Sequence, residues 1–213
     1  MGNKTIEILS IIPARSGSKG LPNKNILPLL GHPLIAYSIK ASLESDMITR
    51  TIVSTDSINI ADIAMEYGAE IPFLRPAKIA QDLSTDFEVF DHALDWLNIN
   101  QGYQPDFVVQ LRPTSPIRKV KIIDSCIQKF ITSKADSLRV ITPSPVTPYK
   151  MWSIEDDNNM KPLLSIKGVK EPYNQPRQLL PETYWQVGFI DVIRLATIVE
   201  KKSMSGDLIL PYI

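Results

Sequence analysis

The chain has 213 residues, which suits one sizeable domain, and 44% of them are hydrophobic, enough to build a core. Its 23 basic and 23 acidic side chains balance, so composition gives no electrostatic reason to expect a nucleic acid or an anionic membrane as a partner. The single cysteine, Cys126, excludes an internal disulfide, and the apolar spacing around it predicts a buried core residue. Neither a signal peptide nor an apolar run of membrane-spanning length is visible, so we expect a cytoplasmic enzyme or binding protein.

Strand-like and helix-like segments alternate through the first two thirds of the chain. Apolar runs predict strands at 6–13, 49–55, 71–74, 106–112 and 135–142. Helical spacing of apolar residues predicts helices at 32–45, 57–68, 84–99 and 117–133. This order predicts an α/β fold with a doubly wound, mostly parallel sheet.

The pattern changes after Thr142, where seven prolines fall within 143–181. Helices tolerate interior proline badly, and two short strands are expected around the polar turn "EDDNN". We interpret 143–181 as an arm inserted into a single domain of residues 1–213, with a strand at 184–193 and a helix after it. Such an arm has little core of its own, so a second subunit is expected to cover its apolar side chains. These are Met151, Trp152, Leu163 and Leu164.

The stretch "IIPARSGSKGLPNKNI", residues 11–26, places Arg15, Lys19 and Lys24 in a loop after the first predicted strand. In a doubly wound sheet, ligands bind at the carboxyl ends of the strands. Glycines let backbone N–H groups approach an anion, and three positive charges suit a polyphosphate. The alternative is a basic surface turn, since neither a Walker-type loop nor a "GxGxxG" fingerprint is present. The residues alone therefore predict a phosphate-binding α/β domain and leave the surface turn open.

The same stretch resembles the signature of the acylneuraminate cytidylyltransferases, the CMP-sialic acid synthetase family. The likeness continues in order through "GHPLIAYSIKASLES", "TIVSTDSINIADIAMEYGAEIPFLRPAKIAQDLSTDF", "LRPTSPIR" and "RQLLPETYWQVGFIDVI", over nearly all of residues 8–195. It implies a Rossmann-like fold of the nucleotide-diphospho-sugar transferase type and a homodimer formed through an inserted arm, which matches 143–181. The implied reaction joins CTP to a nonulosonic acid, whose anomeric hydroxyl attacks the α-phosphorus while pyrophosphate leaves.

The resemblance also implies roles for particular residues, with Arg15, Lys19 and Lys24 as the catalytic groups that hold the triphosphate. The nucleotide-binding set that it implies is Ala14, Arg15, Ser16, Gly17, Lys19, Asn25, Arg75, Asp82, Ser84 and Thr85. The set that it implies for the sugar acid is Arg112, Thr114, Ser115, Arg177 and Gln178. Without the resemblance, Arg75 would be a surface arginine and Ser115 a cap for the next helix, and Trp185 either stacks on the sugar or fills the core.

The chain departs from the family pattern in the sugar pocket. Arg112 stands where sialic acid synthetases usually have glutamine, and Val187 and Asp191 stand near the usual asparagine and tyrosine. A guanidinium adds a charge and a fork suited to a carboxylate or phosphate. The departures imply a changed pocket and favour relatives acting on other nonulosonic acids, such as legionaminic acid.

The resemblance implies Mg²⁺ as the cofactor, held by an aspartate pair in a "DID" segment. This sequence ends "SGDLILPYI", where that segment should begin, so no metal ligand is assigned in it. We expect a truncated or shortened chain that binds CTP and turns over weakly. Two alternatives stay open: a non-catalytic CTP-binding module, and a transferase for an eight-carbon acid such as KDO.

Overall fold

The computed structural model describes residues 5–213, which form two compact units. The first unit comprises 5–140 and 188–212, and the second comprises 141–187 with Ile213. Among residues 5–213, none of the helices has both the length and the apolar character needed to cross a membrane.

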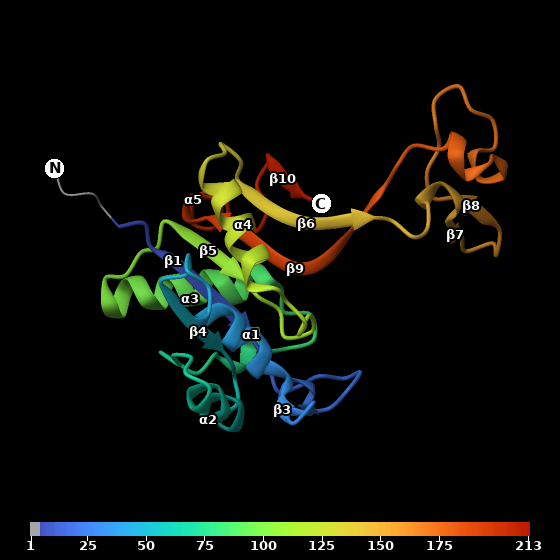
Figure 1. Cartoon of the computed structure of the whole chain (residues 1–213). Helices are drawn as coiled ribbons and strands as arrows, with labels where there is room; N and C mark the ends of the chain where they lie inside the picture. The colour runs from blue at the N-terminus through green and yellow to red at the C-terminus, as the bar shows by residue number, and fades with distance from the viewer. Residues whose placement is uncertain (1–4) are drawn as a thin grey trace. The chain divides into compact units, whose positions relative to one another are not determined.

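The first unit is built on a six-stranded sheet in the order β10-β6-β9-β5-β1-β4 (Figure 1). The strands are β1 (Ile8–Pro13), β4 (Arg50–Ser54), β5 (Phe107–Gln110), β6 (Ser137–Pro143), β9 (Tyr184–Arg194) and β10 (Ile209–Tyr212). The central strand β1 runs parallel to β4 and β5, and β10 runs parallel to β6. Strand β9 pairs antiparallel with β5. The predicted α/β fold with a doubly wound, mostly parallel sheet is confirmed.

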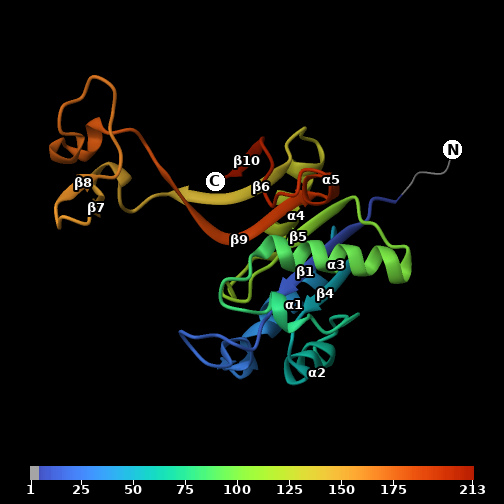
Figure 2. The same cartoon turned by 180° about the vertical axis from the view of Figure 1, so that it is seen from behind.

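Helices cover both faces of this sheet (Figures 1 and 2). Helices α1 (Leu34–Leu43), α2 (Ile58–Glu66) and α4 (Val120–Ile131) pack on one face, and α3 (Asp86–Gln101) and α5 (Leu195–Val199) pack on the other. Strand β1 supplies Ile8 and Ile12 to the first core and Leu9 and Ile11 to the second. A strand buried on both faces needs apolar residues at every position, which explains the continuous apolar run. Cys126 is fully buried in the first core, as predicted.

Two expectations for secondary structure were wrong. Residues 71–74 form no strand. The residue before them, Glu70, makes an isolated parallel bridge with Ile52. Pro72 and Pro76 lack the N–H groups that a ladder needs, so the segment cannot pair regularly. The helix expected to begin at residue 32 begins at Leu34, because β3 (His32–Pro33) pairs with β2 (Pro28–Leu29) in a short hairpin.

The second unit contains the antiparallel pair β7 (Trp152–Ile154) and β8 (Met160–Pro162), as expected around the polar turn. Its other elements are the 3-10 turns η3 (Pro148–Lys150), η4 (Pro172–Asn174) and η5 (Arg177–Leu179). Many of its large apolar side chains are exposed, among them Ile154, Met160, Leu163 and Leu179. The single domain of 1–213 and the dimerising role of 143–181 stay predictions.

Candidate active site

A cavity of about 240 Å³ lies where β1 and β5 end and α3 begins. Seven of the residues predicted for nucleotide or sugar binding line it: Arg15, Lys24, Asn25, Arg75, Ser84, Arg112 and Thr114. These residues come from four separate parts of the sequence. The sheet brings them together because the carboxyl ends of its parallel strands meet at one edge.

The basic loop after β1 is fixed by contacts at both of its ends. The N–H of Ala14 donates to the carbonyl of Ser54 at 3.0 Å, which extends the pairing of β1 with β4. Ser16 then donates its backbone N–H and its hydroxyl to Asp56, at 2.8 and 2.7 Å. Farther along, the buried Asn25 donates its side-chain amide to the carbonyl of Arg15 at 2.9 Å. A side-chain β-carbon at Gly17 would meet nothing within 4 Å, so this part of the loop faces open space.

Two cations of this loop, Arg15 and Lys19, are paired with one carboxylate. Arg15 lies 3.0 Å and Lys19 lies 2.5 Å from the two oxygens of Asp82, and Arg15 also donates to the carbonyl of Gln81. The hydrogen bond from Lys19 and the two positive charges hold the pKa of Asp82 below its usual value. Arg15, which lines the cavity, and Lys19 therefore converge on one negatively charged group, as they would on a phosphate.

Arg75 is buried, so the alternative of a surface arginine is wrong. Its side chain is 5% exposed, it donates to the carbonyl of Ser54 at 2.6 Å, and its backbone N–H donates to Thr55 at 2.7 Å. Burial lowers its pKa to about 10, and the negative charges of Asp56 and Asp86 oppose that shift. The guanidinium therefore keeps its charge at neutral pH beside the cavity.

The next segment leads into α3. The hydroxyl of Ser84 accepts the backbone N–H of Gln81 at 2.9 Å, which closes a turn. Thr85 caps α3 and forms a reciprocal capping box with Glu88. Ser84 thus lines the cavity directly, whereas the hydroxyl of Thr85 is engaged by its own helix.

The loop after β5 carries the predicted sugar-contacting residues Arg112, Thr114 and Ser115. The expectation that Ser115 caps the next helix was wrong, because α4 begins at Val120 and the Ser115 hydroxyl donates to the carbonyl of Gly188 at 3.2 Å. Arg118 fixes the loop by donating to the carbonyl of Arg112 at 2.6 Å. Arg112 and Thr114 are left facing the cavity.

Three acidic residues contact residues of the site: Asp56, Asp86 and Asp191. Asp56 and Asp86 were not predicted from the sequence, and Asp191 was noted only as a departure from the family pattern in the sugar pocket. Asp86 lies 2.6 Å from the guanidinium of Arg112, and Asp191 lies 3.8 Å from the same nitrogen. Burial raises the pKa of Asp191, against the opposing charges of Arg139 and Arg112. An aspartate inside the apolar strand segment "VGFIDVI" was the available signal, since a buried carboxylate needs a cationic partner.

Arg177 and Gln178 lie in the second unit, where they line a separate cavity of about 460 Å³. Arg177 donates to the carbonyls of Pro145 at 3.1 Å and Ser144 at 2.8 Å, both within that unit. Trp185 is 58% exposed, so it does not fill the core. The sugar-binding roles of Arg177 and Gln178 stay predictions.

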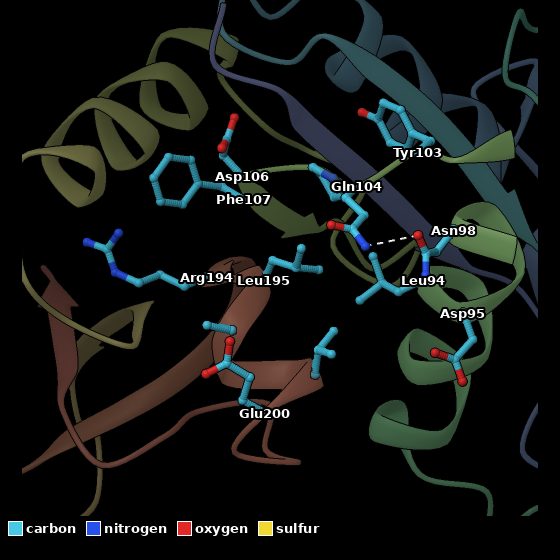
Figure 3. A pocket seen from close by; sticks show the side chains of 13 residues that line it. Leu94, Asp95, Asn98, Tyr103, Gln104, Asp106, Phe107, Arg194, Leu195 and Glu200 are labelled. Atoms are coloured by element: carbon cyan, nitrogen blue, oxygen red, sulfur yellow. Dashed lines mark hydrogen bonds between the residues drawn. The ribbon is translucent and has the colours of Figure 1, made fainter. Parts of the chain in front are cut away.

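A larger cavity of about 560 Å³ lies at the opposite end of the sheet, where β5 begins and β9 ends (Figure 3). Its polar groups already pair within the protein: Gln104 donates to Asn98 at 2.9 Å, and Arg194 donates to the carbonyls of Ala135 and Ser133. Asp95 and Glu200 lie at its edge (Figure 3). Their charges repel a polyphosphate, and none of the predicted site residues lies there, so the smaller cavity is the candidate active site.

The possible metal-binding side chains among the described residues are not gathered into a larger cluster. Within residues 5–213, no group of three or more His, Cys, Asp and Glu side chains could hold a metal ion. Asp86, which lines the cavity, and the buried Asp191 both face Arg112. Their charges are therefore directed at a guanidinium, and no step below is assigned to a metal.

Comparisons with known proteins identify the family of the chain. A profile of the family described as Cytidylyltransferase matches residues 9–182. The chain is 40% identical over 159 residues to CMP-N,N'-diacetyllegionaminic acid synthase of Legionella pneumophila, covering 73% of this chain and 66% of that protein. It is 44% identical over 126 residues to N-acylneuraminate cytidylyltransferase of Escherichia coli, covering 59% and 29%. It is 34% identical over 153 residues to pseudaminic acid cytidylyltransferase of Campylobacter jejuni, covering 71% and 65%. The matches thus span less than two thirds of each of these relatives.

The fold is also found among solved structures. The chain is similar to CMP:2-keto-3-deoxy-manno-octonic acid synthetase complexed with CTP, with a TM-score of 0.66 and 14% identity over 92% of this chain and 77% of that one. It is likewise similar to 4-diphosphocytidyl-2C-methyl-D-erythritol synthase of Anaerococcus prevotii, with a TM-score of 0.61, 13% identity and 97% and 86% coverage. At these identities the likeness shows the Rossmann-like nucleotidyltransferase fold alone. The family match over residues 9–182, with the relatives above, shows that the chain belongs to the cytidylyltransferase family that its motifs resemble.

Proposed function

We propose that this protein is a cytidylyltransferase that transfers CMP from CTP to the anomeric hydroxyl of a nonulosonic acid and releases pyrophosphate. The observation that carries the proposal is the cavity at the strand ends, where Arg15, Lys24, Arg75 and Arg112 converge in a member of this family. A nucleoside triphosphate bears about four negative charges near neutral pH, and a site with four cationic side chains matches that charge.

The chemistry asks the protein mainly to position the reactants. The hydroxyl oxygen of the sugar acid forms a bond to the α-phosphorus, and the bond from that phosphorus to the oxygen bridging to the β-phosphorus breaks. Pyrophosphate leaves with the electron pair, and the hydroxyl proton passes to solvent. Arg15, Lys19 and Lys24 hold the triphosphate in line and stabilise the charge that builds on the leaving group.

The same cavity also supports a proposal for the class of sugar acid that the protein binds. Arg112 and Thr114 line it beside the predicted nucleotide-binding residues. The names of the relatives include legionaminic, neuraminic and pseudaminic acids, all of the nonulosonic class. We propose a substrate of this class, with legionaminic acid as the first choice because of the charge at Arg112.

Three further predictions accompany this function. We propose that Mg²⁺ is required. We propose a homodimer, supported by the exposed apolar side chains of the second unit. The cytoplasmic location stays a prediction.

The test is an assay of pyrophosphate release with CTP and, separately, N-acetylneuraminic, legionaminic and pseudaminic acids and KDO, each with and without Mg²⁺. Release with one nonulosonic acid establishes the function and names the substrate. Release with KDO alone favours the eight-carbon alternative. Binding of CTP by calorimetry without release from any acid favours the non-catalytic module and contradicts the proposal.

A further inference from the structure

A row of alternating charges reaches the candidate active site at Arg112 and Asp86, which line its cavity. It runs from Arg139 on β6 through Asp191 on β9 and Arg112 after β5 to Asp86, the first residue of α3. Nη2 of Arg112 lies 2.6 Å from Asp86 and 3.8 Å from Asp191, and the other oxygen of Asp191 lies 3.7 Å from Nε of Arg139. Asp191 pairs in register with Gln110, and Arg112 follows two residues later, so the sheet places these side chains on one face.

The two carboxylates beside Arg112 differ in their surroundings. Asp191 is 3% exposed, and within residues 5–213 its Oδ1 has no hydrogen-bond partner. A carboxylate buried in this way depends on its cationic neighbours and cannot turn to water. Asp86 is 35% exposed and lines the cavity together with Arg112. The ion pair is partly open to solvent, which screens it, so Asp86 can leave Arg112 at a lower cost than the buried Asp191 can.

A ligand that fills the cavity meets Arg112 where Asp86 now contacts it. The guanidinium has several donors, and an incoming oxyanion can take those that Asp86 releases. The same nitrogen, Nη2, lies 3.8 Å from the buried Asp191 and donates to Oε1 of Gln110 at 3.2 Å, and these neighbours stay in place when a ligand binds. One carboxylate is therefore placed as a fixed anchor and the other as a competitor for the ligand.

We propose that Asp191 is a positioning residue that holds Arg112 at the cavity and that Asp86 is its displaceable counter-ion, which gives way to an oxyanion of the bound ligand. The inference rests on the proposed function for the identity of that ligand. The oxyanion is the carboxylate of the nonulosonic acid or a phosphate of CTP, since both bind a guanidinium through paired oxygens. Asp86 and Asp191 thereby have opposite effects on the affinity of the site, although both lie near the same nitrogen of Arg112.

Replacing the two carboxylates has opposite expected effects. Asp86→Asn removes the competitor, so the affinity for the anionic ligand should rise roughly threefold to tenfold. Asp191→Asn removes the anchor, so the same affinity should fall roughly tenfold, with KM affected more than kcat. Asp95→Asn is the matched control, because this exposed residue lies on the same helix but at the larger cavity. It should change neither value.

Two measurements separate the possible ligands. Calorimetry with CTP and with each sugar acid alone gives the affinities, and pyrophosphate release gives the KM of each substrate. Tighter CTP binding in Asp86→Asn assigns the phosphate, and a gain confined to the sugar acid assigns the carboxylate. In an Arg112→Gln background, Asp86→Asn should no longer change the affinity. If Asp86 only stabilised the start of α3, its replacement would have the same effect with or without Arg112.

The inference is overturned if Asp86→Asn leaves every affinity unchanged or weakens binding, or if its effect persists in the Arg112→Gln background. If no acid supports pyrophosphate release, the proposed function fails, and the calorimetric comparison still decides the inference. Thermal unfolding checks that Asp191→Asn folds. If it does not, the Asp86→Asn and Arg112→Gln pair decides alone.

Discussion

Both carboxylate oxygens of Asp56 accept hydrogen bonds from Ser16, one from its backbone N–H at 2.8 Å and one from its hydroxyl at 2.7 Å. Ser16 follows β1 and Asp56 follows β4, so the contact ties the basic loop to the neighbouring strand. Burial by itself raises the pKa of Asp56, but the hydrogen bonds from Ser16 and the charge of Arg75 hold it below its usual value. The carboxylate therefore stays charged at neutral pH and anchors the loop.

Replacing Asp56 by alanine should lower the affinity for CTP about tenfold, because hydrogen bonds to a charged group contribute roughly 1.5–3 kcal/mol and ~1.4 kcal/mol is one decade. The loop would lose its anchor while the buried core stays intact. Calorimetry with CTP measures the change. Asp62→Ala, at an exposed position of α2, is the control and should bind as the wild type does. Equal affinity of Asp56→Ala and the wild type would show that the loop is held without this contact.

Arg15→Gln and Lys19→Gln should each lower kcat/KM by at least ~10–100-fold, because each removes a charge-assisted bond to the triphosphate. Steady-state pyrophosphate release with CTP and the preferred acid measures this. Lys40→Gln is the matched loss of charge and should leave the rate unchanged, because the exposed ammonium of Lys40 on α1 lies 4.0 Å from Glu44 and away from the cavity residues. A loss of kcat/KM of equal size in Lys40→Gln would show that the effect of Arg15→Gln and Lys19→Gln comes from net charge alone.

The sequence predicted the parts of the fold that depend on local pattern. The continuous apolar run of β1 indicated a strand covered on both faces, and the helical spacing around Cys126 indicated its burial; both follow from packing the side chains of one element. The strand predicted at 71–74 was wrong because its apolar content was given more weight than Pro72 and Pro76, which prevent regular pairing.

The candidate site was predicted only in part, because its charges pair across long stretches of the chain. The buried guanidinium of Arg75 donates to the carbonyl of Ser54. The residues around "FLRP" do not predict this contact, because Ser54 lies in another part of the sequence. The contacts of Arg112 come from α3 and β9 at once. Such pairings follow from strand order and register, which a single sequence does not contain.

The Asp136 carboxylate gives a prediction for stability against pH. Its Oδ2 accepts the backbone N–H groups of Asp207 and Leu208 at 2.9 and 3.0 Å and lies 2.9 Å from Lys201. The bond from Leu208, then Lys201 and Asp207, lowers the pKa of Asp136 from 3.8 to about 2. Because the folded pKa lies below the ordinary one, the stabilisation is present above about pH 4 and is lost as the pH falls toward 2. Asp136→Asn should therefore lower Tm at pH 7 and lose that difference near pH 2.

Thermal unfolding of both proteins across this range measures the effect. Asp62→Asn provides the control for loss of one exposed carboxylate and should follow the wild type at every pH. A Tm difference for Asp136→Asn that stays constant from pH 7 to pH 2 would contradict a contribution from the charged carboxylate.

The apolar surface of the second unit gives the prediction for assembly. Trp152, Ile154, Met160 and Leu179 are all exposed there, and surfaces of this kind mark interaction sites. We expect a dimer by light scattering, and Ile154→Lys should shift the population to monomers because it would place a charge in the interface. Leu83→Lys is the control, since Leu83 is 92% exposed in the first unit, and it should leave the mass unchanged. A wild-type protein with the mass of one chain at micromolar concentration would contradict the dimer, and a dimer unaffected by Ile154→Lys would move the interface away from this strand.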